Sequence, residues 1–144
     1  MLARTPIETL RLTAEQLGIP QIEYDTLISV RDDLASGRIH HVDLDIQHGG
    51  CAVGFDRDSK LFNMQYVRFD HACGTAQCIG GHMWARLGFC GSIFGPFYHL
   101  FAPRISVNYL DLTTEQAVRA IDYWLQGETG QCWPMALADD GITP

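Results

Sequence analysis

The segment from Cys73 to His82 holds the residue types in this chain best suited to chemistry. It runs CGTAQCIGGH, with two cysteines and a histidine four places after the second. Thr75 is a typical helix N-cap and Gly88 a typical helix end, so we predict a helix between them with Cys78 in its first turn. The positive end of a helix lowers the pKa of a thiol, and residues four apart share one helix face. This predicts Cys78 and His82 as candidates for a nucleophile and its base, or for two metal ligands.

A structural role for the same segment is the favoured interpretation. Beside Cys78 runs an apolar stripe at helical spacing, formed by Ala76, Ile79, Met83 and Leu87, so the thiol would serve as a small buried side chain. The pair Gly80-Gly81 is unfavourable inside a helix. We therefore expect another part of the chain to lie close against it, either the Trp133-Pro134 segment or the aromatic residues around Phe97, unless a ligand occupies that place.

Two groups of side chains are spaced so that a metal site is conceivable. One group consists of His71, Cys73, Cys78 and His82, whose spacing differs from the paired short knuckles of zinc domains. The other consists of His41, Asp43, Asp45 and His48, which alternate along a predicted strand. A packed helix entrance and a solvated strand face explain both groups without a metal. We therefore expect no metal and no other cofactor.

Charge and cysteine content limit the classes of function. Ten basic against seventeen acidic side chains give a formal net charge of −7. Because lysines and arginines form no stripe, the sequence argues against nucleic-acid binding. No apolar leader opens the sequence and no apolar run is long enough to cross a bilayer, and the five cysteines are an odd number. These features predict a cytoplasmic protein with reduced thiols. The partner expected for an interaction domain of this kind is an unidentified protein or a second copy of the chain.

The periodicity of the chain predicts a mainly α, compact fold with one small β-hairpin, in a single domain over residues 1–144. Helices are expected over residues 6–17, 23–36 and 113–127, the last opened by a capping box of Thr113 and Gln116. Alternation over residues 38–55, broken by Gly49-Gly50, predicts the hairpin. Residues 1–20 are interpreted as a helical N-terminal extension, and residues 135–144 as a loosely held tail.

The order of these motifs resembles a group of small bacterial and phage proteins that have no established activity. That group has an F-x-M element, a CGT-x-x-C-x-x-G-[WH] signature, an LGL(S/T)-x-x-(E/Q)-A helix and a closing Trp-Pro pair. The matching positions here are Phe62, Met64, Cys73, Gly74, Thr75, Cys78, Gly81, His82, Leu110, Leu112, Thr113, Gln116, Ala117, Trp133 and Pro134.

This resemblance covers about the last two thirds of the chain and implies a shared fold. It favours Cys73, Gly74, Thr75 and Cys78 as the unit that matters. In many members of the group the position of His82 is tryptophan, which argues against His82 as an obligatory base or ligand.

A weaker similarity links the chain to papain-like cysteine peptidases, in which a Cys-Gly pair opens a helix. It would make Cys73 the nucleophile, Gln65 the oxyanion helper and His99 the base. Those enzymes hold the histidine in a strand-rich half, whereas residues 91–144 here are predicted to be irregular and then helical. The sequence therefore predicts a non-enzymatic accessory or interaction domain. Its alternatives are a thiol-dependent hydrolase or redox protein using Cys73 or Cys78, and a small zinc-binding domain.

Overall fold

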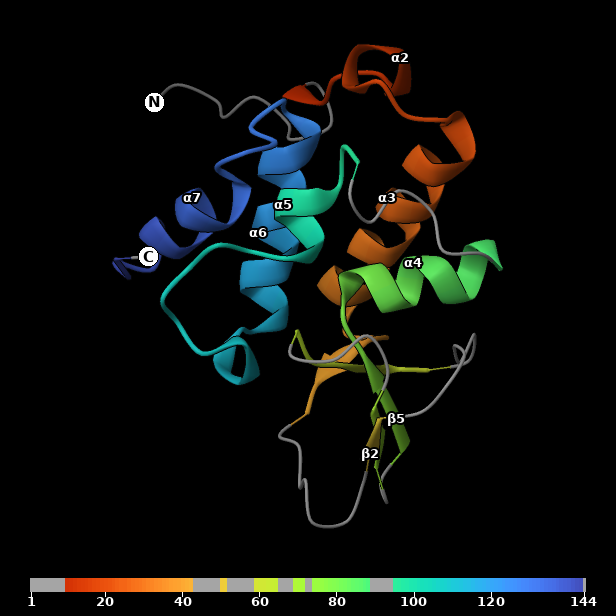
Figure 1. The fold of residues 1–144 in the computed structure, drawn as a ribbon, viewed down its shortest axis with the longest axis vertical. Helices are drawn as coiled ribbons and strands as arrows, with labels where there is room; N and C mark the ends of the chain where they lie inside the picture. Colours follow the sequence, from red (N-terminus) through yellow and green to blue (C-terminus); the bar gives the residue numbers. More distant parts are fainter. Residues whose placement is uncertain are drawn as a thin grey trace.

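Helices occupy one end of the molecule and a small sheet the other (Figure 1). The computed structural model describes residues 10–42, 50–51, 59–64, 69–71, 74–88 and 95–143, with side chains at 10–42, 59–64, 77–88 and 95–143. The helices are α2 (Ala14–Leu17), α3 (Gln21–Ser36), α4 (Ile79–Leu87), α5 (Tyr98–Phe101), α6 (Thr114–Leu125) and α7 (Cys132–Ala138), with a 3-10 turn η1 (Tyr109–Asp111). The predicted mainly α, compact fold is confirmed.

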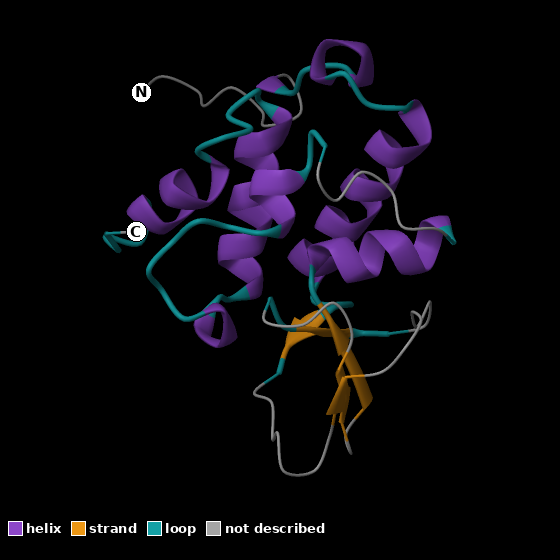
Figure 2. Cartoon of the chain, viewed as in Figure 1, coloured by secondary structure: helices purple, strands orange, loops and turns teal. Residues whose placement is uncertain are grey.

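In the described part of the chain the sheet has five short strands, and Figure 2 shows them below the helices. They are β1 (His40–His41), β2 (Gly50–Cys51), β3 (Leu61–Phe62), β4 (Phe69–His71) and β5 (Gly74–Gln77), in the spatial order β1-β3-β5-β4-β2. Strands β1, β3 and β5 are parallel, whereas β4 runs antiparallel to both β5 and β2. Strand β5 lies at the centre of the sheet and leads directly into α4.

Of the predicted hairpin within residues 38–55, the structure describes only residues 38–42 and 50–51, and the strands there are not paired with each other. Strands β1 and β2 lie at opposite edges of the sheet, and β1 pairs instead with β3, where the backbone N–H of Val42 extends the pairing to Phe62 O at 3.2 Å. Alternating hydrophobicity identifies a strand but not its neighbour, because the partner is set by contacts remote in sequence. A hairpin within the described residues is β4–β5, whose strands are separated by residues 72–73.

Helix α6 is the centre of the helical end, and it packs against both α3 and α7. The predicted capping box is present: Thr113 Oγ1 accepts from Gln116 N at 3.1 Å, and Thr113 N donates to Gln116 Oε1 at 3.0 Å. The ring of Trp124 stacks on Phe97 with centroids 4.8 Å apart. The inward face of the helix is fully buried and consists of Ala117, Ala120, Ile121, Trp124 and Leu125. A local cap and an apolar stripe thus explain why this segment is a helix.

Two predictions about the ends of the chain are wrong in part, at residues 11–13 and 135–138, while residues 1–9 lie outside the described part. Residues 11–13 are not helical, and α2 begins only after Thr13, which forms its own capping box with Gln16. Residues 135–138 belong to α7 and are no loose tail, since Ala136 and Leu137 are fully buried. Proline 134 lies in the first turn of α7, where a helix does not need the missing N–H.

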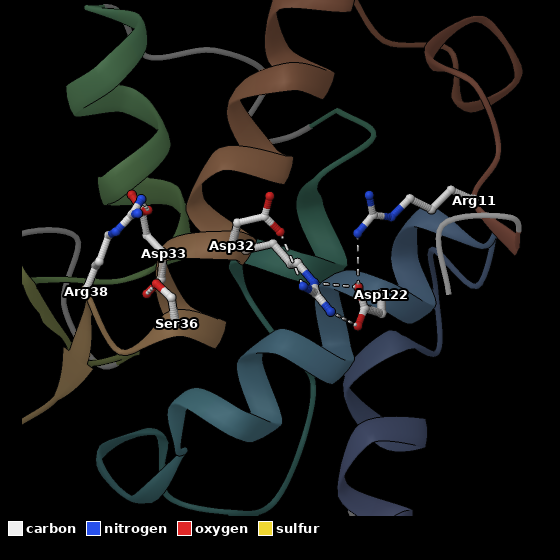
Figure 3. A network of polar contacts seen from close by, with 7 residues as sticks. Arg11, Asp32, Asp33, Ser36, Arg38 and Asp122 are labelled. Carbon is white, nitrogen blue, oxygen red and sulfur yellow. Dashed lines mark hydrogen bonds and ion pairs between the residues drawn. The ribbon is translucent and has the colours of Figure 1, made fainter. Parts of the chain in front are cut away.

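A nearly buried ion pair joins α3 to α6 (Figure 3). The guanidinium of Arg31 binds the carboxylate of Asp122 through two hydrogen bonds, both 3.0 Å long, and Arg11 Nη2 lies 3.9 Å from Asp122 Oδ1. The Asp122 side chain is only 9% exposed, so it is largely removed from water. Bidentate pairing raises the pKa of Arg31. This contact fixes the rotation of α3 against α6.

We expect Asp122→Asn to lower the free energy of unfolding by about 2 kcal/mol, because it leaves the Arg31 guanidinium with a weaker, neutral partner in a partly dry site. Urea denaturation measures the change. The control is Asp32→Asn, since Asp32 also contacts Arg31, at 3.2 Å, but is 59% exposed. That variant should lose less than about 0.5 kcal/mol. Equal losses in both variants would contradict a special role for Asp122.

Candidate functional site

The thiol of Cys78 caps the N-terminus of α4. Helix α4 begins at Ile79, and the N-cap is Cys78, not Thr75 as predicted. Thr75 lies in β5 instead, where it pairs with Asp70 of β4. The pairing of β5 with a strand on each side keeps this residue extended. Cys78 Sγ accepts a hydrogen bond from Gly81 N at 3.4 Å. The sulfur therefore satisfies one of the backbone donors that every helix leaves open at its start.

Burial determines the acidity of this thiol. Cys78 is 5% exposed, and desolvation raises its pKa; the hydrogen bonds from Gly81 and Gly80 lower it, but by less. The predicted lowering of the pKa at a helix N-terminus is therefore wrong. A thiol with a raised pKa stays protonated at neutral pH, and the thiolate is the nucleophile. Cys78 is thus suited to capping and packing and poorly suited to attack.

The imidazole of His82 connects α4 to the sheet. Its Nε2 lies 2.8 Å from the carbonyl oxygen of Leu61 in β3, and the residue is 2% exposed. Because a carbonyl can only accept, Nε2 must carry the proton and donate it. That nitrogen is then neither a base nor a metal ligand. Cys78 and His82 lie one helical turn apart, as predicted, and His82 N donates to Cys78 O. Their side chains do not bond each other: Cys78 accepts from Gly81 N, and His82 donates to Leu61 O.

Gly80 and two buried polar residues, Asn63 and Gln77, complete this joint. A Cβ at Gly80 would lie 3.2 Å from the ring of Phe101, so α5 approaches α4 closely there. We expected the aromatic segment around Phe97 to contact the glycine pair, and this is confirmed at Gly80. On the sheet side, Asn63 N donates to Gln77 O at 3.2 Å, and Asn63 Nδ2 donates to Val42 O at 3.0 Å.

Asn63 and Gln77 are fully buried, and the sequence analysis did not single them out as site residues. Their signal was present, since both amides are flanked by apolar residues in short segments. The side chain of Asn63 bonds the backbone of Val42, next to β1, and the backbone carbonyl of Gln77 accepts from Asn63 N.

Most of the other predicted site residues are only partly described. Gly74 and Thr75 belong to β5, and Gly81 supplies the N–H that Cys78 accepts. Cys73 and Gln65 lie outside the described residues, as do Asp43, Asp45 and His48. His71 belongs to β4. The described His99 lies on α5 and is exposed, and Nε2 of His41 contacts Leu110 O at 2.9 Å.

Among the side chains of residues 10–42, 59–64, 77–88 and 95–143, no three His, Cys, Asp or Glu come together as a possible metal site. Both predicted ligand groups include residues outside these ranges, so they remain predictions. Three cavities within the same ranges lie away from Cys78 and His82. Their linings come from residue 10, α3, residues 99–104 and the segment from residue 115 to residue 139.

Comparison with known proteins gives no relative for this site. No family model matches the chain, and no curated protein or solved structure matches it either. The resemblance to small bacterial and phage proteins therefore stays a prediction from sequence.

None of the helices in the described part of the chain combines the length and apolar character needed to cross a bilayer.

We expect Cys78→Ala to cost about 1 kcal/mol more of unfolding free energy than Cys132→Ala. Both thiols are buried, but only Cys78 caps a helix, whereas Cys132 Sγ makes a long contact of 3.9 Å to His99 O. Losing a cap has a cost of about 1 kcal/mol, and the two variants lose the same sulfur atom. Chemical denaturation under reducing conditions measures both. Similar losses would show that the Gly81–Cys78 bond adds little.

Alkaline pH should destabilise the protein through its buried thiols. Burial raises the pKa of Cys132 from 9.0 to about 12. Below pH 9 the thiol is protonated in both states; between these values the unfolded chain ionises it while the folded chain does not, so unfolding is favoured as pH rises. Urea denaturation at about pH 8 and about pH 10.5 should show a smaller loss in Cys132→Ala than in the wild type. An identical loss in the two proteins would contradict the proposed origin.

Proposed function

We propose that this chain is a non-enzymatic accessory or interaction domain in which the Cys-Gly-Thr-x-x-Cys segment has an architectural role. The observation that carries the proposal is the capping of α4 by the buried thiol of Cys78. Cys78, the residue that the sequence favours most as a reactive thiol, therefore stabilises the junction between β5 and α4. A protonated, enclosed thiol is of little use to a hydrolase or a thiol oxidoreductase.

The surroundings of Cys78 support the same proposal. A catalytic cysteine needs a base within hydrogen-bond reach and an approach for substrate. The nearest histidine on its helix, His82, donates its Nε2 proton to Leu61 O. Cys78 and His82 are both buried. The side of α4 at Gly80 is closed by the ring of Phe101. All three observations fit a packed joint between two parts of a fold.

Charge and cysteine chemistry support the expected setting and partner. A net charge of −7 disfavours a polyanionic partner such as nucleic acid. Cys78 and Cys132 are free and buried, which suits a reducing compartment such as the cytoplasm. The proposed partner is a protein, either a different chain or a second copy of this one.

The thiol-dependent alternative now depends on Cys73. In its papain-like form it needs a strand-rich half to hold His99, and residues 95–143 contain α5, α6 and α7 without a strand in that range. His99 is itself exposed on a one-turn helix. Both observations favour the architectural proposal.

Thiol labelling tests the proposal. We expect iodoacetamide near neutral pH to modify Cys78 and Cys132 of the native protein far more slowly than free cysteine, because both thiols are buried and have raised pKa values. Digestion and mass spectrometry identify the labelled positions, and the same protein in urea is the control, in which both cysteines should react quickly. Native labelling at Cys78 or Cys73 faster than that of free cysteine would instead favour the hydrolase or redox alternative.

A further inference from the structure

A small cavity between α5 and α7 has no carboxylate in its lining. It has a volume of about 170 Å³ and is lined by His99, Arg104, Gly130, Gln131, Trp133 and Pro134. Two of these side chains can be cationic, one carries an amide, and none carries a carboxylate. Two further cavities in the described part of the chain, of about 280 Å³ each, include acidic residues in their linings: Asp122 and Asp139 in one, Glu115 in the other. The cavity between α5 and α7 differs from both in having no carboxylate in its lining.

Arg104 is the second unusual feature of this cavity. Six arginine side chains are described, and five of them pair with aspartates: Arg11, Arg31, Arg38, Arg86 and Arg119. Arg104 forms no ion pair with any described side chain; its guanidinium carbon lies 6.0 Å from the centre of the Tyr98 ring. Its hydrogen-bond donors are therefore available to an external acceptor, while its position over Tyr98 limits its movement.

The walls of the cavity are held by bonds between α5 and α7. Trp133 Nε1 donates to Leu100 O at 2.8 Å, and Cys132 Sγ lies 3.9 Å from His99 O. Trp133 is fully buried, so the segment that carries Gln131 has a fixed position against the one that carries His99. A fixed cavity reduces the entropy cost of binding. The Trp133-Pro134 pair of the sequence motif thus forms part of the lining of this cavity.

We propose that this cavity binds a small oxyanion, the phosphate or carboxylate group of a small molecule. A guanidinium matches either group through two parallel hydrogen bonds, and the ring of His99 and the amide of Gln131 supply further donors. The volume is several times that needed by one water, and it fits one such group with the remainder of the molecule directed to solvent. This inference is independent of the architectural role of Cys78.

Titration with inorganic phosphate and with acetate tests the inference. Sodium chloride keeps the ionic strength constant, and the backbone amide signals of Gly130 and Gln131 are followed by NMR. We expect saturable shifts with at least one of the two anions. Arg104→Gln should weaken that binding about tenfold, the effect of losing hydrogen bonds from a charged group. Arg104→Lys, which keeps the charge but loses the fork, should fall between the two.

Arg38→Gln is the matched control, because it removes the same charge from an exposed arginine that does not line the cavity. It should bind as the wild type does. The inference is overturned by shifts of the wild type that stay linear with both anions, by unchanged binding in Arg104→Gln, or by equal weakening in Arg38→Gln. If Arg104→Gln does not fold, His99→Gln takes its place and must also weaken the binding.

Discussion

The hydrogen bond from His82 to the carbonyl of Leu61 connects the two ends of the molecule, and the position of α4 depends on it. On one side of this bond lies a sheet whose strands are two to four residues long, too small for independent stability. On the other side lies a helical core organised around α6. The imidazole of His82, held in the packed helix α4, lies 2.8 Å from the carbonyl of Leu61. The stable helical core thereby holds strand β3 in place. Because His82 is buried, breaking this bond removes the acceptor of its N–H in a site largely closed to water.

The Cys78 cap belongs to the same constraint. The chain must change from the extended geometry of β5 to a helix within one residue, and Cys78 makes this change with its own backbone still extended, at φ −76° and ψ 179°. A side chain that accepts from Gly81 N at this point stabilises the change of direction. A sulfur atom can do so in an apolar environment because it is only weakly polar. The requirement for an acceptor and the requirement for burial are therefore met by one residue.

Local signals in the sequence predict a large part of this fold. The Thr113 capping box, the glycine ends at Gly37 and Gly88, and the apolar spacing of α3 and α6 all act within a few residues, and all are present. The TAEQ segment at residues 13–16 carries the same type of signal, a capping box, and it marks the start of α2 at residue 14. A helix that continues through residues 11–13 is incompatible with this cap. The helical structure of α7 was hidden by Pro134, which suggests a loop when its position in the helix is unknown.

The rest depends on contacts that are remote in sequence. Which strand lies beside β1 is decided by Leu61 and Phe62, some twenty residues away, and no periodicity encodes that choice. The pKa of Cys78 is a balance between a local effect, the helix N-terminus, and a global one, burial; only the first can be seen in the sequence. Likewise, His82 and Cys78 share a helix face as expected, but the carbonyl that binds His82 comes from another strand.

The three tryptophans of the chain lie on α4, α6 and α7, and none lies in the sheet. The emission of Trp124 and Trp133 therefore reports the state of α6 and α7, whereas Trp84 lies on α4, the helix that is joined to the sheet. A partial opening that detaches the strands while α6 and α7 stay packed would leave the emission of Trp124 and Trp133 nearly unchanged, yet it would expose the strand amides to hydrogen exchange. Agreement between these two observables is the criterion for whether the protein unfolds in one step or in two.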